Sequence, residues 1–519
     1  MKKHFKKHIF ILILLNQFSI FSQDPVVNQL FINSYKLIET ARMENGVYLD
    51  AVSYNGVDKP ASLAANGVGL ISLCIADSIY KLTNDHINWE QNALDLVNQT
   101  IESFTQFYNN NKTNQKGFFL RYFNYMNGDI ESGWGSEFST IDNAVFTIGL
   151  NFCKNHFNEN DTLVAKIDFL VNNIDYTSAI SSDGQSLYMV LDQLGNGSQV
   201  TNSFNEYMLV AYLAKSACSN LDGYSKSISY WNNRYLSALV GPQHSNYWGY
   251  ELLSDLDNTF ISSFIPQFTY YYCHDFKNNP DYMNYFKNAR VSDSLWWQLS
   301  TPSINQNLWG LGAGENPGGG YSANFIDNNA LKIISPQTIA GFLPVYSNGI
   351  ENLKNIYTEN LGSAKYALPS NNSEHVLWRY SLLDTTLRCD YIQLIDFSNM
   401  LFGLSTLPEF LGENFFSINN EFKSCLGNAS INENDFTVEN RLKIFPNPTS
   451  KNLNIRFLDQ NLDKSTVIIR NSDGKYIEEI DLDLINGQIF INVENLEKGF
   501  YFCEIIVNKE CINIKFIKN

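Results

Sequence analysis

Apolar residues recur every three or four positions over most of the first 416 residues, which is the spacing of one face of an α-helix. Residues 94–108, 141–152 and 163–174 show it most clearly, with apolar positions at Leu94, Val97, Ile101, Phe104, Tyr108, Ile141, Val145, Ile148, Phe152, Leu163, Ile167, Leu170 and Ile174. Loops rich in Gly, Asn, Ser and aromatic residues separate such stretches. Because paired amphipathic helices bury apolar faces against neighbours on both sides, residues 25–416 predict an all-α toroid of helical hairpins.

The pattern changes after residue 416. Residues 417–442 are rich in Asn, Ser and Glu and predict a linker. Residues 443–519 hold short β-rich runs, such as "STVIIRN" and "GFYFCEIIV", separated by Gly, Asn and Asp turns. These runs predict a small C-terminal all-β sandwich, for which an ordinary carbohydrate-binding module is the alternative interpretation.

The first 22 residues have the pattern of a secretory signal peptide. Four lysines precede the apolar run 9–15, and small or polar residues follow near Ser22. No later segment has the roughly 18 to 20 consecutive apolar residues of a transmembrane helix. We therefore expect an exported protein without a transmembrane segment.

The composition limits the possible partners. Removal of the signal peptide takes away four lysines and changes the formal charge from −17 to −21. Such a negative surface repels nucleic acid and anionic membranes, so a neutral substrate is the expected partner and nucleic acid is not.

The chain has eight cysteines. Four of them lie in apolar helical patterns and predict small buried side chains: Cys74, Cys153, Cys218 and Cys273. The sequence does not give the connectivity of any disulfide.

The stretch "GWGSEFSTIDNAVFTIG" places two carboxylates beside a helix start. Ser139 is a good N-cap, and Asp142 resembles the acidic partner of a capping box, so capping and function are equally good explanations for Asp142. Capping leaves Glu137 unexplained, and we expect this side chain to project into a cleft at the mouth of the helix. Glu206 begins another apolar helix, where a carboxylate also gains from the helix dipole.

Several loop residues are of the type that binds sugars. The loop "NLWGLGAGENPGGGY" holds three of them, and Trp134 and Asp384 lie on other loops; the predicted substrate-binding set is Trp134, Trp309, Glu315, Tyr321 and Asp384. Aromatic faces stack on sugar rings and carboxylates bind hydroxyls, although an aromatic side chain held by glycines can also simply pack its loop. The sequence contains no HExxH motif, CxxC motif or histidine cluster of the kind that binds a metal, and no cofactor motif. It also lacks the G-x-S-x-G motif of serine hydrolases. Acid–base catalysis by carboxylates is therefore the remaining type of catalysis that this sequence supports.

Six motifs in order resemble the glycoamylase-like domain family, close to the β-1,2-glucanases of glycoside hydrolase family 144: "SLAANGVGLISL", "SEFSTIDNAVFTIG", "FNEYMLVAYL", "DYMNYFKNAR", "NLWGLGAGENPGGGY" and "SPQTIAGFLP". The resemblance covers about residues 30–413 and implies an (α/α)6 toroid that hydrolyses β-1,2-glucan or a related β-glucan with a carboxylate pair. The family's acidic positions fall on Glu137, Asp142 and Glu206. The chain departs from the family at Asn143, where Thr is usual, and at Glu315-Asn316-Pro317, where Asp-Gly-Pro is usual, which bears on the linkage that is cleaved.

Residues 443–519 resemble the C-terminal sorting domain of type IX secretion substrates through "FPNP", "GKY", "LEKGFYF" and "KFIKN" in that order. This resemblance implies the type IX secretion machinery as a partner and a secreted or cell-surface location.

Together these features predict an exported glycoside hydrolase, with Glu206 as the acid and Glu137 on the water-activating side. A catalytically inactive glycan-binding protein on the same scaffold is the alternative. Transglycosylation and exo-acting release of disaccharides also stay open.

Overall fold

The computed structural model describes residues 24–135, 137–254, 262–301, 304–326, 328–359, 361–427, 436–438, 442–445, 448–457, 464–471, 475–483, 488–507 and 510–518. The chain divides into two units, a helical unit that ends at Gly427 and a C-terminal unit that begins at Asn428. The predicted signal peptide, residues 1–22, lies outside the described residues.

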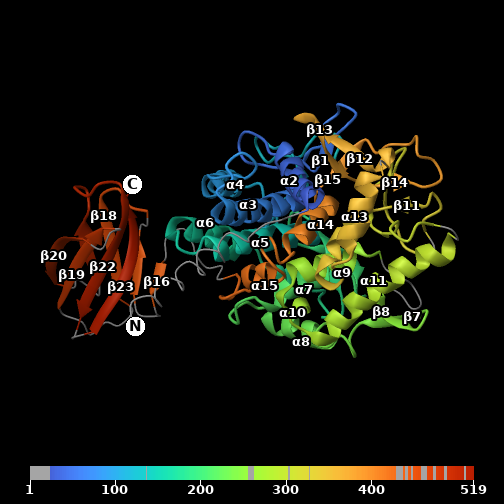
Figure 1. The fold of residues 1–519 in the computed structure, drawn as a ribbon. Coiled ribbons are helices and arrows are strands. Elements are labelled where there is room, and N and C mark those ends of the chain that lie inside the picture. The colour runs from blue at the N-terminus through green and yellow to red at the C-terminus, as the bar shows by residue number, and fades with distance from the viewer. Residues whose placement is uncertain are drawn as a thin grey trace, which may run out of the picture. The chain divides into compact units, whose positions relative to one another are not determined.

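Helices dominate the first unit (Figure 1). The described α-helices are α2 (Pro25–Thr40), α3 (Leu63–Thr83), α4 (Ala93–Asn109), α5 (Thr140–His156), α6 (Asp161–Asn172), α7 (Met208–Lys215), α8 (Tyr224–Arg234), α9 (Phe264–Tyr272), α10 (His274–Lys277), α11 (Pro280–Ser300), α12 (Pro336–Gly341), α13 (Gly349–Thr358), α14 (Leu394–Ser405) and α15 (Asn414–Asn420). Helices α4 and α5 cover the first two stretches with helical periodicity, and α6 covers the third except for its last two residues. The helical prediction is confirmed, while the (α/α)6 arrangement in particular stays a prediction.

Helix α3 alone among the described helices is long and apolar enough to cross a bilayer. However, 89% of its most apolar window is buried inside the structure, as expected of a core helix.

Glycines let the central helices approach closely. Helices α3 and α5 lie side by side (Figure 1), and a Cβ atom on Gly67 of α3 would lie 2.5 Å from the carbonyl oxygen of Val145 in α5. A Cβ on Gly149 of α5 would lie 2.7 Å from the carbonyl oxygen of Gly67. Only glycine fits at this crossing, because packed cores have no room for an added methyl group.

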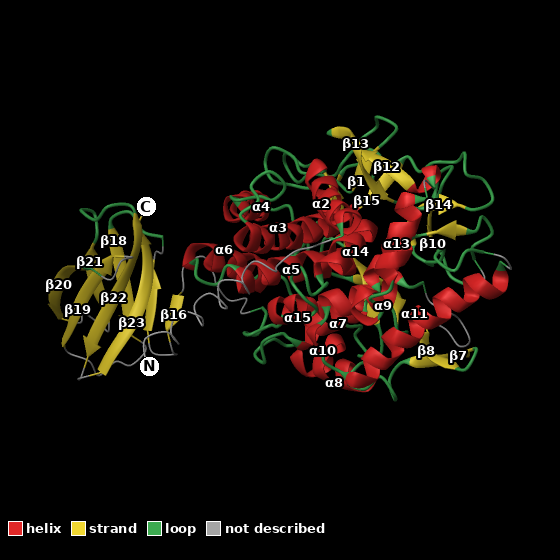
Figure 2. Cartoon of the chain, in the orientation of Figure 1, coloured by secondary structure: helices red, strands yellow, loops and turns green. Residues whose placement is uncertain are grey.

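Short strands, in small sheets of two or three, lie between the helices of the helical unit. They are β1 (Ala51–Ser53), β2 (Ala61–Ser62), β3 (Tyr122–Phe123), β4 (Phe138–Ser139), β5 (Leu187–Leu191), β6 (Gly197–Thr201), β7 (Gln243–Tyr247), β8 (Tyr250–Ser254), β9 (Ala313–Glu315), β10 (Tyr321–Ala323), β11 (Ile333–Ile334), β12 (Lys365–Leu368), β13 (Asn371–Leu377), β14 (Tyr380–Ser381) and β15 (Tyr391–Gln393). Figure 2 shows them among the loops as small separate sheets. Strands β2, β4 and β15 run directly into helices α3, α5 and α14, and β11 is separated from α12 by Ser335 alone.

The C-terminal unit consists of two four-stranded antiparallel sheets, β16-β17-β18-β21 and β20-β19-β22-β23. The strands are β16 (Phe436–Val438), β17 (Leu442–Phe445), β18 (Asn452–Phe457), β19 (Lys464–Asn471), β20 (Tyr476–Asp483), β21 (Gln488–Asn492), β22 (Gly499–Val507) and β23 (Glu510–Lys518). Residues of both sheets, among them Ile455 and Val467, contribute to one buried cluster. The predicted sandwich requires such shared packing, and the sandwich itself stays a prediction.

A disulfide corrects the sequence analysis. Cys218, expected to be a free buried side chain, is bonded to Cys425. The other three cysteines of that group, Cys74, Cys153 and Cys273, are buried and free as predicted. The apolar pattern around Cys218 suggested a small core residue. No local pattern pointed to Cys425, because the two residues are separated by 207 positions in the sequence.

The helical unit also extends further than the predicted boundary at residue 416. Besides the disulfide, the amide of Leu426 donates to the carbonyl of Ser216 at 2.8 Å, and the amide of Cys218 donates to the carbonyl of Leu426 at 2.7 Å. These bonds attach residues 417–427, predicted as the start of the linker, to the helical unit.

Candidate active site

Three helix starts are joined by backbone hydrogen bonds at one end of the helical unit. The amide of Leu394, the first residue of α14, donates to the carbonyl of Asp50 at 3.0 Å. The amide of Leu63, the first residue of α3, donates to the carbonyl of Arg121 at 3.0 Å, and the amide of Arg121 donates to the carbonyl of Glu137 at 3.0 Å, just before α5. Polar side chains on these segments are thereby gathered at the N-terminal ends of the helices.

Arg121 brings two of the predicted catalytic carboxylates together. Its Nη1 lies 2.7 Å from Oε1 of Glu137, and its Nε lies 3.6 Å from Oδ2 of Asp142. Ser139 caps α5 as predicted, since its hydroxyl accepts a hydrogen bond from the amide of Asp142 at 3.3 Å and donates to the Asp142 carboxylate. Burial raises the pKa of Asp142, and Arg121 opposes this rise. Asp142 therefore contacts the capping hydroxyl of Ser139 and also belongs to the charged cluster.

Two carboxyls that the sequence analysis did not single out lie in the same cluster. Burial raises the pKa of Asp50 to about 6, and the nearby charge of Asp142 adds to this rise. A hydrogen bond from Ser62 acts in the opposite direction and lowers the pKa. Asp396 in the first turn of α14 is 2% exposed. Burial raises its pKa to about 7, although Arg379 and the hydroxyl of Tyr321 favour the ionised form. Its Oδ2 is buried without a hydrogen-bond partner among the described residues.

A repeated sequence pattern could have identified Asp396. Helix α5 reads "TIDNAVFTIGL" and α14 reads "LIDFSNMLFGL", so Ile-Asp and Gly-Leu stand at the same spacing in both. The glycine is a close-contact residue in both helices, because a Cβ on Gly403 of α14 would lie 1.9 Å from the carbonyl oxygen of Ala340. Asp142 and Asp396 are each the third residue of their helix.

Glu206 and Tyr321 lie near this cluster. Glu206 comes two residues before α7, and its charge helps to raise the pKa of Tyr207 and of Tyr321, for which burial is the main cause. The Tyr321 hydroxyl donates to Oδ1 of Asp396 at 3.1 Å, yet the residue is 59% exposed. The residue is thus open to solvent while its hydroxyl reaches the buried carboxyl of Asp396, so a solvent-accessible side chain contacts the cluster directly.

Aromatic and basic side chains border the carboxyl cluster. The ring centroids of Trp134 and Tyr122 are 4.7 Å apart, and the guanidinium of Arg121 lies over the Tyr122 ring at 4.8 Å. Nζ of Lys59 lies 5.2 Å from the centroid of Trp134 and 4.1 Å from that of Tyr391. Trp134, predicted as a sugar-binding residue, is therefore in the neighbourhood of Glu137.

Glu315 is nearly buried, at 8% exposure. Its Oε2 accepts a hydrogen bond of 2.5 Å from the amide of Tyr391, and its own amide donates to Oε1 of Gln393 at 3.0 Å. Burial raises its pKa. Glu315 thus fixes β9 to β15 beside the cluster.

The structure does not bring Trp309 or Asp384 to the cluster. Trp309 is 2% exposed and donates from Nε1 to Oδ1 of Asn352 at 3.2 Å, so its loop packs it into the core. Asp384 is exposed and accepts from the hydroxyl and the amide of Thr386, which is a local turn contact. Neither residue is therefore part of the proposed site. For Trp309, the surrounding glycines indicated a loop but not the direction in which the side chain points.

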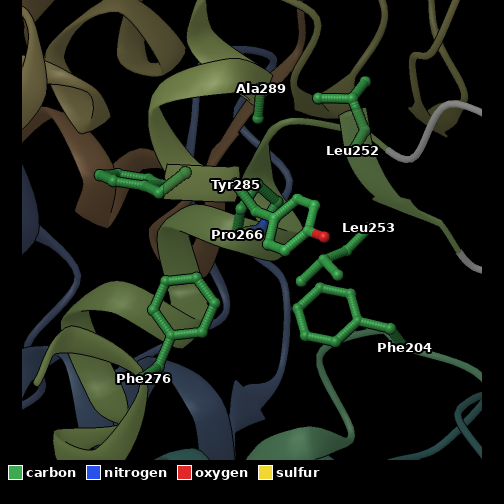
Figure 3. Close-up of a pocket in the computed structure, with 8 residues that line it drawn as sticks. Phe204, Leu252, Leu253, Pro266, Phe276, Tyr285 and Ala289 are labelled. Carbon is green, nitrogen blue, oxygen red and sulfur yellow. The ribbon is translucent and has the colours of Figure 1, made fainter. Parts of the chain in front are cut away.

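Within the described residues, no three His, Cys, Asp or Glu side chains are arranged to hold a metal ion. The cavity drawn in Figure 3 is not the candidate site either: it has a volume of about 10 Å³ and an almost entirely apolar lining, which leaves room for about one water.

Comparison with known structures gives the fold of the helical unit. The endo-β-1,2-glucanase of Chitinophaga pinensis, in complex with sophorotriose and glucose, aligns with a TM-score of 0.59 at 13% identity over 78% of this chain and 99% of that chain. The β-1,2-glucanase of Parabacteroides distasonis aligns with a TM-score of 0.58 at 12% identity over 76% of this chain and 58% of that chain. The endo-β-1,2-glucanase of Talaromyces funiculosus with sophorose aligns with a TM-score of 0.54 at 14% identity over 76% and 85% of the two chains. The helical unit shares the fold of these glucanases.

Residues 443–519 match the family model of the secretion system C-terminal sorting domain. This domain indicates export, with secretion or attachment to the outer cell surface, as the sequence analysis expected. No curated protein matches the chain.

Proposed function

We propose that the helical unit is an exported glycoside hydrolase that cleaves β-1,2-glucan or a related β-glucan. The observation that carries this proposal is the group of carboxyls at the helix N-termini, bordered by Trp134 and Tyr321, on a fold shared with β-1,2-glucanases. Glycoside hydrolysis needs one carboxyl to protonate the leaving oxygen and a second to activate water or attack the sugar.

In the proposed mechanism Glu206 donates the proton and Glu137 assists the water. The water-activating role needs a carboxylate, and Glu137 is held in an ion pair with Arg121 at 2.7 Å. Asp142 would position Arg121 and thereby Glu137. Asp396 is the alternative proton donor, because burial raises its pKa to about 7 and leaves one carboxyl oxygen without a partner in the described part of the chain.

The test is incubation of the mature protein with linear β-1,2-glucan, β-1,3-glucan and β-1,4-glucan between pH 4 and pH 8, with the product length followed over time. We expect shortened oligosaccharides from β-1,2-glucan. Products of intermediate length that shorten with time indicate endo cleavage, and short products from the start indicate exo cleavage. Products that grow longer with time indicate transglycosylation. No shortened product from any of the three polymers would refute the enzyme proposal.

One observation favours a second candidate, a glycan-binding protein without turnover. Arg121 already neutralises Glu137, and a carboxylate engaged in this way is less available to a water molecule. This candidate predicts retardation in affinity electrophoresis on a glucan gel with no rise in reducing sugar, whereas the hydrolase predicts both.

A further inference from the structure

An aromatic hairpin outside the carboxyl cluster carries a tryptophan in an unfavourable backbone position. Strands β7 and β8 pair from Gln243–Ser254 to Tyr247–Tyr250 and reverse through Trp248 and Gly249. Both turn residues have positive φ, 53° and 86°. A two-residue turn of this kind is type I′, for which Asn-Gly is the preferred sequence, and a bulky residue with positive φ is strained. Folding alone would favour a residue other than tryptophan at position 248.

The packing of the helical unit does not account for this tryptophan either. Trp248 is 42% exposed, and its described ring contact is with the neighbouring Tyr247, at 5.7 Å between centroids and 51° between planes. Together with the half-buried Tyr250, these residues form the aromatic tip of the hairpin, residues 247–250.

The base of the hairpin is firmly held. His244 lies 2.9 Å from Oε1 of Glu251 through Nδ1 and 2.8 Å from the carbonyl of Ala238 through Nε2. The side-chain amide of Asn288 in α11 donates to the carbonyl of Glu251 at 2.8 Å. The aromatic tip is therefore presented from a fixed base, which lowers the entropy that binding would cost.

The same hairpin is packed against the segment that carries Glu206. Leu252 and Leu253 line a small apolar cavity with Phe204, and Figure 3 shows Leu253, Phe204 and Tyr285 turned toward one another. Phe204 lies two residues before Glu206. Tyr250, which follows the turn, is two residues from Leu252 along β8, which corresponds to about 7 Å of strand. The tip thus lies outside the carboxyl cluster but on an element anchored beside it.

We propose that Trp248 forms a second glycan-binding subsite, in which its indole face stacks on a sugar ring of a β-glucan chain whose other end is bound at the carboxyl cluster. An uncharged ligand fits the formal charge of −17, which disfavours an anionic partner, and the apolar face of a sugar ring fits an exposed indole. This inference rests on the proposed function, because it takes its ligand from it.

Trp248→Asn tests the subsite without threatening the fold, since it creates the favoured Asn-Gly turn. The matched control is Leu194→Asn, which replaces another exposed apolar residue, 59% exposed, that precedes a glycine with positive φ in the β5–β6 connection. Affinity electrophoresis on long β-1,2-glucan measures binding, and kcat/KM is measured on the polymer and on short oligosaccharides.

For Trp248→Asn we expect about a tenfold loss of affinity for the polymer and a similar rise in KM, as for the loss of one stacked apolar face. The kcat and the kcat/KM on short oligosaccharides should stay at the wild-type value, and Leu194→Asn should change neither. Unchanged polymer affinity in Trp248→Asn, or an equal loss in Leu194→Asn, would overturn the subsite even if the wild type is an active hydrolase. A wild type that binds glucan without turnover would refute the hydrolase and leave the affinity comparison as the test of the subsite; one that binds none of the polymers refutes both.

Discussion

Replacement of Asp396 by asparagine should change how the stability of the helical unit depends on pH. The carboxyl is 2% exposed, and its pKa rises from 3.8 to about 7 because burial disfavours the charged form. In the unfolded chain the same group ionises near its ordinary value. Between about pH 4 and pH 7 the folded chain therefore holds a proton that the unfolded chain has released, and the free energy of unfolding falls as the pH rises through this window.

The magnitude follows from the size of the pKa difference. At about 1.36 kcal/mol per pKa unit, a rise from 3.8 to about 7 destabilises the folded state by about 4 kcal/mol above pH 7. About 2 kcal/mol of this loss falls between pH 5 and pH 7. Asparagine has nearly the same shape and does not ionise, so Asp396→Asn should lack this slope and gain stability over the wild type at pH 8.

Urea unfolding at pH 5, 6, 7 and 8, followed by tryptophan fluorescence, measures this slope. All eight tryptophans lie in the helical unit, so the signal does not report on the C-terminal unit. Asp384→Asn is the control, because this carboxyl is exposed and its pKa is lowered by Thr386, so it stays ionised across the range. Parallel pH profiles for the wild type and Asp396→Asn would refute the reasoning, as would a variant less stable than the wild type at pH 8.

Three further changes test other features. Glu206→Gln should lower turnover on β-1,2-glucan by about 10² to 10⁴ with little change in melting temperature, because it keeps the shape but cannot deliver a proton; near wild-type kcat in a folded variant would pass the acid role to Asp396. Cys218→Ser should lower the free energy of unfolding by up to about 5 kcal/mol, since the disulfide to Cys425 closes a loop of 207 positions; an unchanged urea midpoint would contradict this. Gly149→Ala should cost about 1 to 3 kcal/mol through overpacking, because its Cβ would lie 2.7 Å from the carbonyl of Gly67; a rise in melting temperature from the better helix propensity of alanine would show that the helices can separate.

The sequence predicted those features that depend on residues only a few positions apart. The helices α4, α5 and α6 and the Ser139 cap follow from periodicity and capping within a few residues. The change from helical to β-strand periodicity indicated a second, β-rich unit, since periods of 3.6 and 2 differ within a single element, but it did not reveal that residues 417–427 are bonded to the helical unit.

Long-range contacts were not readable in this way. Asp50 and Asp396 acquire their raised pKa values from burial among segments that are distant in the sequence, while in the sequence they are an ordinary turn acid and an ordinary first-turn acid. Trp309 shows the opposite case, because its loop looks functional yet the side chain completes the core. The Cys218–Cys425 bond depends on the path of the chain around the whole unit, which no local pattern reports.

The disulfide also decides how mechanical force would travel through the protein. Its second cysteine stands just before the end of the helical unit, and the sorting domain follows. If the protein is attached to the cell surface and binds a polysaccharide as proposed, drag on the ligand would load the chain between the helical unit and the C-terminal attachment. Tension entering at Cys425 passes covalently to Cys218, near the end of α7, rather than pulling on α15 and peeling the last helices from the unit. The disulfide would thus protect the end of the helical unit from tension. After reduction of the bond, we expect this end to be the first part of the unit to unfold under load.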